Sequence, residues 1–150
     1  MKKNLGFSIV LAFSTCFLYG QADQLVGIYL TGEKSSQVRI FKATDGKYYG
    51  KVEWIRDEPD KLDVNNPDEN LQKNKVWGLI ILKGFHYNED KNRWEGGTIY
   101  DPDNGKTYDA FMWFDEDNVN LYLKGYVLGM KFIGRETLWV REMELRKRLE

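Results

Sequence analysis

The chain has 150 residues, of which 42% are hydrophobic and 30% are charged, a composition typical of one globular domain. This composition excludes collagen-like, disulfide-dense and wholly disordered structures. The 22 basic and 23 acidic residues give a net charge of -1. That is too balanced for the strongly basic surface of a dedicated nucleic-acid-binding protein, so we expect no nucleic-acid partner.

Residues 1–20 have the pattern of a secretory signal peptide. Lys2 and Lys3 form a basic start, residues 5–18 are mostly apolar, and Gly20 and Ala22 are small residues of the kind that a signal peptidase needs. The apolar run is shorter than the roughly 20 residues of a membrane-spanning helix. We therefore expect an exported protein, periplasmic or secreted, with no transmembrane segment after cleavage. We favour cleavage after Gly20, and cleavage after Ala22 is the alternative.

The single cysteine, Cys16, falls within this leader. Attachment of a lipid at Cys16 is disfavoured, because Thr15 and Phe13 fit poorly before a lipidated cysteine. The mature chain would then contain no cysteine, which excludes both a disulfide framework and a catalytic thiolate.

After the leader, the chain is a series of short segments rich in Val, Ile, Tyr, Phe and Trp, separated by Asp, Asn and Gly. No long segment has a helical period, so the pattern is typical of antiparallel β-structure. Turn-forming residues separate alternating runs and predict three hairpins. Their turns lie at Asp45-Gly46, at 101–106 and at 115–118.

Short antiparallel strands without covering helices must stack or close, because open edges promote aggregation. Glycines within the strands favour closure, since a small barrel needs bends and bulges. These glycines are Gly50, Gly96, Gly97, Gly125 and Gly134. We predict an all-β domain over residues 21–141, a single lipocalin-like antiparallel barrel of about eight strands. A β-sandwich is the alternative.

Two segments interrupt this pattern. Arg56 to Lys75 is long, polar and charged, and predicts an extended loop with a helical turn near 69–73; loops of this length are often functional. The charged tail, residues 142–150, is too short to form a stable helix alone. We expect it to fray or to dock through Leu145 and Leu149.

Several motifs together resemble one family of secreted bacterial proteins, the domain of unknown function 2147. The motifs include Gly27-x-Tyr29, Tyr49-Gly50-Lys51-Val52, Asn66-Pro67, Gly78-Leu79, Trp94-x-Gly96-Gly97, Ile99 to Tyr108, Gly125-Tyr126, Gly134-Arg135 and Trp139-x-Arg141. The resemblance implies an exported lipocalin-like barrel and, by analogy of fold, the binding of a small apolar molecule. It supplies no catalytic residues. Tyr29 stands where the family commonly has Trp.

The family motifs also have a structural interpretation. Tyr29 near the first strand and Trp139 and Arg141 in the last could close the bottom of the barrel, with the guanidinium stacked on an aromatic ring. The segment from Asp101 to Gly105 predicts a turn on its own chemistry, because Pro and Gly favour the required backbone angles.

The sequence gives little support for catalysis, and we predict no enzyme activity and no cofactor. His86 is the only histidine and lies beside a turn, and no serine stands in a nucleophile-elbow context. A zinc site of His and Cys ligands is excluded. Asp101 and Asp103 resemble the start of a calcium loop, but Lys106 occupies the position of its glycine, so a metal site is not expected.

Binding in the barrel is the function that the pattern favours. We predict a non-catalytic protein that holds a small hydrophobic or amphipathic molecule, since a barrel of this size either is filled by side chains or holds one ligand. The apolar faces of the strands supply the expected interior. Besides the candidate ligand-binding residues, this interior includes Val38, Ile40, Val52 and Phe114. The candidate ligand-binding residues are Tyr48, Trp54, Tyr108, Met112, Leu121 and Leu123.

The alternative is a filled barrel that acts through its outer surface. Tyr49, Phe111, Trp113, Tyr122 and Tyr126 would face outward, which is more aromatic surface than a monomer usually exposes. In that case the protein would associate with itself or with a component of the cell envelope.

Overall fold

A computed structural model describes residues 20–127, 129–130 and 134–147. Cys16, Leu149 and all but the last residue of the predicted leader lie outside these ranges. Among the described residues no helix is long and apolar enough to span a bilayer. The elements are the 3-10 helix η1 (Asp23–Leu25) and the strands β1 (Gly27–Leu30), β2 (Ser36–Lys42), β3 (Tyr48–Ile55), β4 (Ile80–Asn88), β5 (Arg93–Asp101), β6 (Lys106–Phe114), β7 (Asn120–Tyr126) and β8 (Gly134–Glu142).

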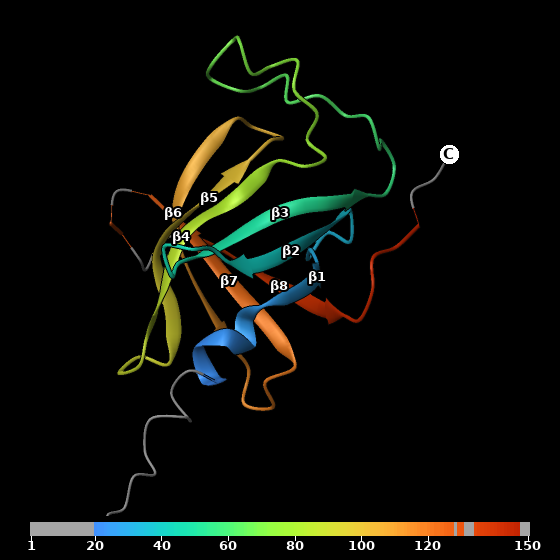
Figure 1. The fold of residues 1–150 in the computed structure, drawn as a ribbon. Helices are drawn as coiled ribbons and strands as arrows, with labels where there is room; N and C mark the ends of the chain where they lie inside the picture. The colour runs from blue at the N-terminus through green and yellow to red at the C-terminus, as the bar shows by residue number, and fades with distance from the viewer. Residues whose placement is uncertain (1–19, 128, 131–133, 148–150) are drawn as a thin grey trace, which may run out of the picture.

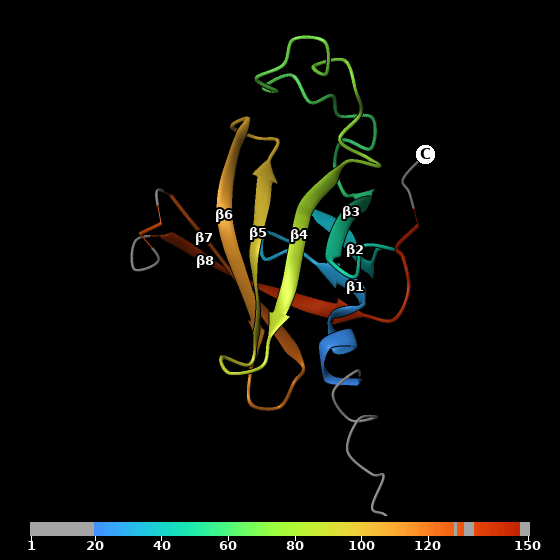
Figure 2. The ribbon, with the colours of Figure 1, turned by 60° about the vertical axis from the view of Figure 1, so that its left-hand side comes forward.

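The strands form a closed antiparallel barrel in sequence order, with β8 paired to β1 (Figures 1 and 2). The predicted barrel is thereby confirmed. The predicted hairpins correspond to β2–β3, β5–β6 and β6–β7. Closure leaves no unpaired edge, which is how this fold avoids edge-to-edge aggregation.

The two ends of the barrel differ. In an up-and-down barrel alternate connections lie at the same end, so the β1–β2, β3–β4, β5–β6 and β7–β8 connections share one end. Helix η1 lies at the other (Figure 1). Between them the inward positions of the strands are filled by a buried core that includes Val38, Ile40, Leu82, Phe85 and Met112. The core extends from Leu25 of η1 to Leu123 and Trp139.

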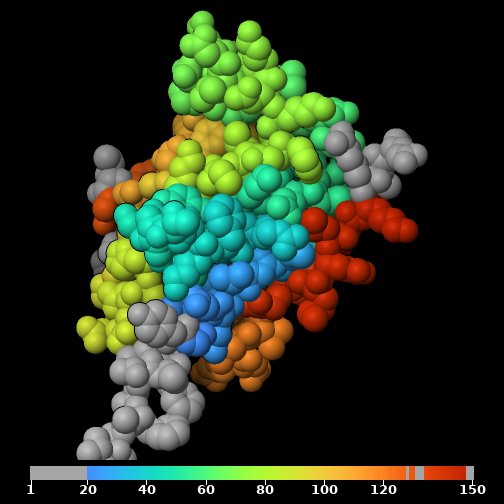
Figure 3. Space-filling model, viewed as in Figure 1, coloured from blue at the N-terminus to red at the C-terminus, as the bar shows by residue number. Residues whose placement is uncertain are grey.

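The β3–β4 connection, residues 56–79, projects above the barrel (Figure 3). It is held together by a bridge between Leu62 and Lys75 and by turns over residues 69–73, where the sequence suggested a helical turn. It docks on the β5–β6 turn, where a Cβ on Gly105 would lie 1.9 Å from the carbonyl oxygen of Asn65. Only glycine permits this approach, and its φ of 70° also favours glycine.

The C-terminal tail docks on the outside of the barrel. The buried Gln37 amide donates to the Glu144 carbonyl oxygen (3.1 Å) and accepts from the Arg146 backbone N–H (2.8 Å). Trp54 Nε1–H donates to the Lys147 carbonyl oxygen (2.9 Å). Leu145, one of the two expected anchors, is 37% exposed, so polar contacts rather than this apolar side chain hold the described part of the tail.

Candidate functional site: a sealed end and an open end

Helix η1 seals one end of the barrel. Its Leu25 side chain is fully buried in the core. Trp94 Nε1–H donates to the Ala22 carbonyl oxygen (3.0 Å), and the Tyr48 hydroxyl donates to the Asp23 carboxylate (2.6 Å). The Trp94 and Tyr48 side chains thus fix the chain just before and within η1.

Arg141 completes this seal from β8. Its guanidinium donates to the carbonyl oxygens of Gln24 and Val26 and to the Tyr29 hydroxyl (2.6 Å). The Tyr29 hydroxyl in turn donates to the Leu25 carbonyl oxygen (2.9 Å). The guanidinium carbon lies 5.0 Å from the centre of the Tyr29 ring, which is the cation–π contact expected from the sequence.

Burial and hydrogen bonding shift the ionisation of the sealing groups. Burial raises the pKa of Tyr29 to about 12, although the Arg141 guanidinium opposes this. Burial and the hydrogen bond to Asp23 raise the pKa of Tyr48. The pKa of Asp23 is lowered by hydrogen bonds from Tyr48 and Lys42. Around neutral pH, both hydroxyls therefore keep the protons that they donate to the seal.

The opposite end contains an open cavity of about 640 Å³. This is within the usual range for sites that bind small molecules. Its walls are apolar and its rim is built from the connections at that end of the barrel. The apolar walls are formed by Ile81, Ile99, Leu123 and Trp139.

Small residues follow one another across β5, β6 and β7, and one of them, Gly125, lines the cavity. Gly97 pairs with Ala110, Ala110 with Gly125, and Gly125 with Arg135. At Gly97 the space is taken by Phe85, whose ring would lie 2.5 Å from an added Cβ. At Gly125 an added Cβ would make only ordinary contacts of 3.6 Å, so the missing side chain leaves room for the cavity.

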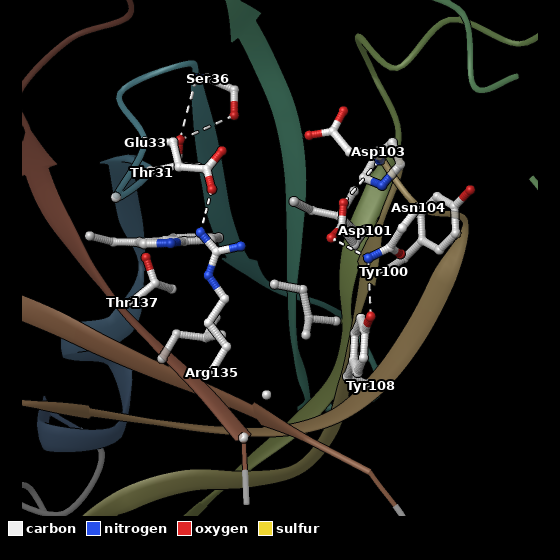
Figure 4. Close-up of a pocket in the computed structure, with 18 of the residues that line it drawn as sticks. Thr31, Glu33, Ser36, Tyr100, Asp101, Asp103, Asn104, Tyr108, Arg135 and Thr137 are labelled. Carbon is white, nitrogen blue, oxygen red and sulfur yellow. Dashed lines mark hydrogen bonds and ion pairs between the residues drawn. The ribbon is translucent and has the colours of Figure 1, made fainter. Parts of the chain in front are cut away.

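Polar groups surround the mouth of the cavity. Arg135, on β8, extends into the space between Thr137 and Tyr108 and forms an ion pair with Glu33 of the β1–β2 turn (Figure 4). Both side chains are exposed, at 77% and 57%. On the opposite wall the Tyr108 hydroxyl accepts a hydrogen bond from Asn104 (3.0 Å).

The β5–β6 turn at the rim is fixed by its own side chains. The Asp101 carboxylate accepts hydrogen bonds from the Asp103 backbone N–H and from the Asn104 amide, both 2.9 Å long. This is the turn that the sequence predicted. Asp103 pairs with Lys61 of the β3–β4 connection. The acidic groups of this turn are therefore already engaged.

The β3–β4 connection supports the rim through a buried carboxylate. Asp63 is fully buried and accepts hydrogen bonds from the Tyr100 hydroxyl (2.6 Å) and the Asn66 amide (2.7 Å). Burial and the contact with Asp63 raise the pKa of Tyr100. The connection is thus tied to β5 beside the mouth.

The structure places two of the six candidate ligand residues, Tyr108 and Leu123, on the cavity wall. Met112 and Leu121 are fully buried in the core below the cavity, and Tyr48 belongs to the seal. Trp54 lies outside, under the tail. A β-bulge at Gln37/Val38 pairs Trp54 with Gln37 but Val52 with Val38, which turns Trp54 to the opposite face.

Other residues at the cavity were not among those candidates. Trp139 was expected at the closed end beside Arg141, yet it lines the cavity from β8. Thr137 and Arg135 are further inward positions on the same strand. Every second residue of a strand faces the same side, so Trp139, Thr137 and Arg135 share the inward side of Arg141. This alternation is the sequence signal that could have identified all three.

The outward aromatics are packed against one another. Trp113 and Tyr122 are stacked with ring centres 5.4 Å apart, and Phe111 contacts Trp113 at 5.3 Å and Tyr126 at 6.0 Å. The Arg93 guanidinium lies 4.3 Å from the centre of the Phe111 ring. Mutual packing leaves Tyr126 only 8% exposed, so the aromatic surface is smaller than the sequence suggested.

No group of three or more His, Cys, Asp and Glu side chains that could hold a metal ion occurs among the residues that the structure describes. His86 is exposed on β4, with its ring against Gly96. The arrangement at the open end offers apolar walls and a polar mouth, which suits reversible binding.

Comparison with protein families identifies the family of this chain. The model of an uncharacterised protein family conserved in bacteria, DUF2147, matches residues 27–141. The chain belongs to this family. No curated protein matches this chain.

Among solved structures, this member of DUF2147 is similar to protein HP1028 from the human pathogen Helicobacter pylori, which is described as belonging to the lipocalin family. The two are 27% identical, and the match covers 80% of this chain and 84% of that one with a TM-score of 0.71. The likeness agrees with the lipocalin-like barrel.

Proposed function

We propose that this protein is an exported, non-catalytic binding protein that holds a small hydrophobic or amphipathic molecule at the open end of its barrel. One observation carries the proposal: an apolar cavity of about 640 Å³ opens at one end of a barrel whose other end is sealed. A molecule that enters can only leave by the same mouth. The lipocalin family of the similar structure supports the same function.

Binding can be tested with a neutral fluorescent probe, N-phenylnaphthylamine, titrated into the purified protein. Gly125→Leu adds a side chain into the cavity from a strand position without backbone strain, and should weaken probe binding by about tenfold or more. Lys124→Leu adds the same side chain to the outer face of the same strand and is the matched control. Equal effects of the two substitutions, or no binding by the parent protein, would contradict the proposal.

Native mass spectrometry of protein purified from its own cell envelope would identify the natural ligand. A stoichiometric small molecule present in the parent protein and absent from Gly125→Leu is the expected result. Its chemistry would then be read from an organic extract.

Export is a separate part of the proposal. It is supported by the leader pattern of residues 1–20 and by the use of residues just beyond it in the seal. Cleavage after Gly20 keeps the Ala22 carbonyl that accepts the Trp94 hydrogen bond, whereas cleavage after Ala22 would remove it. The intact mass of protein from the periplasm or the medium should therefore correspond to a chain that starts at Gln21. Recovery of the uncleaved chain from the cytosol would contradict export.

A second candidate function is association through the outer wall. Trp113, Tyr122 and Leu138 form one cross-strand row over β6, β7 and β8, and Leu138 is 37% exposed. Light scattering after size exclusion tests it. A monomer whose Trp113→Ser variant behaves identically would exclude an obligate partner at this surface.

A further inference from the structure

The cavity has one basic side chain among the described residues, and it comes from a strand. Among the described residues that line the cavity, Arg135 is the single basic one. It occupies an inward position opposite Gly125, so no side chain from that neighbour separates it from the cavity. Figure 4 shows its guanidinium in the mouth, between the wall that carries Thr137 and the wall that carries Tyr108.

The partner of Arg135 is easily displaced. Glu33 belongs to the β1–β2 turn, and both members of the pair are largely exposed. Exposed ion pairs contribute little because water and salt screen them and because two long side chains must be held in place. A carboxylate delivered by a ligand could take the position of the Glu33 carboxylate while Glu33 returns to water.

The other carboxylates at the mouth already have partners, and two hydroxyls there can donate to an anion. Asp101 is engaged by its own turn and Asp103 by Lys61, so these carboxylates are already used. The Tyr108 hydroxyl accepts from Asn104, which leaves its hydrogen available for another acceptor. Thr137 adds a second hydroxyl to the lining.

We infer that the ligand is an amphiphile with a single carboxylate head, which exchanges with Glu33 on Arg135 while its apolar chain lies against Ile99, Leu123 and Trp139. This inference rests on the proposed function, because it names the class of molecule that the same cavity takes. The head stays at the mouth and the chain extends toward the core. The charge-assisted contact selects acids over neutral molecules of the same length.

The test compares dodecanoate, dodecanol and dodecyltrimethylammonium as competitors of N-phenylnaphthylamine, each below its micelle concentration. The parent protein should bind dodecanoate about tenfold more tightly than dodecanol. Arg135→Gln should reduce the affinity for dodecanoate to that for dodecanol, so that the preference for the acid is lost. Glu33→Gln, which removes the competing carboxylate, should strengthen dodecanoate binding.

Arg39→Gln is the matched control, because Arg39 pairs with Glu53 on the outer wall, away from the cavity. Equal affinities for the acid and the alcohol in the parent protein would overturn the inference. So would preference for the cationic amphiphile, or equal losses in Arg39→Gln and Arg135→Gln. If neither the probe nor any competitor binds, the proposed function itself fails and this inference falls with it.

Discussion

Two arginines on the inward face of β8 show how the two ends of the barrel differ. Arg141 donates to two backbone carbonyls and to the Tyr29 hydroxyl, all of which are fixed by the fold. Arg135 pairs with one exposed glutamate on a turn. The same residue type on the same strand is therefore a structural clamp at one end and an exchangeable binding group at the other.

This contrast extends to the neighbours of each arginine. Around Arg141 the inward space is filled by rings and by Leu25 of η1. Opposite Arg135, Gly125 has no side chain to fill the space. Stability should depend on the sealed end and ligand binding on the open end, and substitutions at each can test that division.

The largest loss of stability is expected for Trp94→Ala at the sealed end. The substitution removes a 2% exposed indole and its hydrogen bond to Ala22. Large-to-small changes of this kind cost about 3 to 5 kcal/mol of the free energy of unfolding. Urea denaturation measures the effect. A loss below about 1 kcal/mol, the usual cost of a minor change, would show that the seal is not a source of stability.

Arg141→Gln should cost about 2 to 3 kcal/mol of the free energy of unfolding, because several charge-assisted hydrogen bonds are lost together. Hydrogen exchange should localise the change to residues 22–30, which contain the groups that Arg141 contacts. Uniform loss of protection over all the strands, with none concentrated there, would contradict a local clamp.

Tyr100→Phe should cost about 1 to 2 kcal/mol, because it removes a hydrogen bond to the buried Asp63 carboxylate. Cleavage by a protease within residues 56–79 should become faster as the connection detaches from β5. Tyr108→Phe removes a hydroxyl from the cavity wall and is the control. Its hydrogen bond from Asn104 is exposed, so Tyr108→Phe should cost less stability than Tyr100→Phe and leave proteolysis unchanged. Equal effects of the two substitutions would show that the buried contact with Asp63 does not hold the connection.

The strands and turns could be read from the sequence because their causes are local. Asp45-Gly46 and the segment from Asp101 to Gly105 carry turn chemistry within a few residues, and Gly46 and Gly105 do adopt positive φ. The contact of Arg141 with Tyr29 was also predictable, from the family motifs that the two residues carry. Local signals and motifs therefore identified the fold and part of the seal.

The cavity was less predictable because alternation gives the face of a residue and not its depth. Met112 and Leu123 both point inward and pair with each other, yet only Leu123 lines the cavity. Trp54 changes face through a bulge that no single strand reveals. The space itself depends on an absent side chain at Gly125 and on rim turns brought together by closure of the barrel.

Acid should weaken the sealed end more than the open end. Hydrogen bonds from Tyr48 and Lys42 lower the pKa of Asp23 below its usual 3.8 in the folded protein. A lowered folded pKa contributes stability that is present above the unfolded pKa and is lost as pH falls through the folded value. Asp23→Asn should therefore reduce the loss of stability below about pH 4, measured by urea denaturation at several pH values. A variant with the parent's pH dependence would exclude Asp23 from this linkage.

The smallest effect is expected for Arg135→Gln without ligand. Its ion pair with Glu33 is exposed, so the free energy of unfolding should change by no more than about 0.5 kcal/mol. Urea denaturation beside Arg141→Gln makes the comparison direct, since the two substitutions are chemically identical and lie on one strand. Similar losses in both would mean that Arg135 is also held by the fold, and then it could not exchange its partner for a ligand. If Arg135→Gln leaves the free energy of unfolding unchanged and Arg141→Gln lowers it strongly, then the fold depends on Arg141 and does not depend on Arg135. Arg135 would then be free to exchange Glu33 for a ligand.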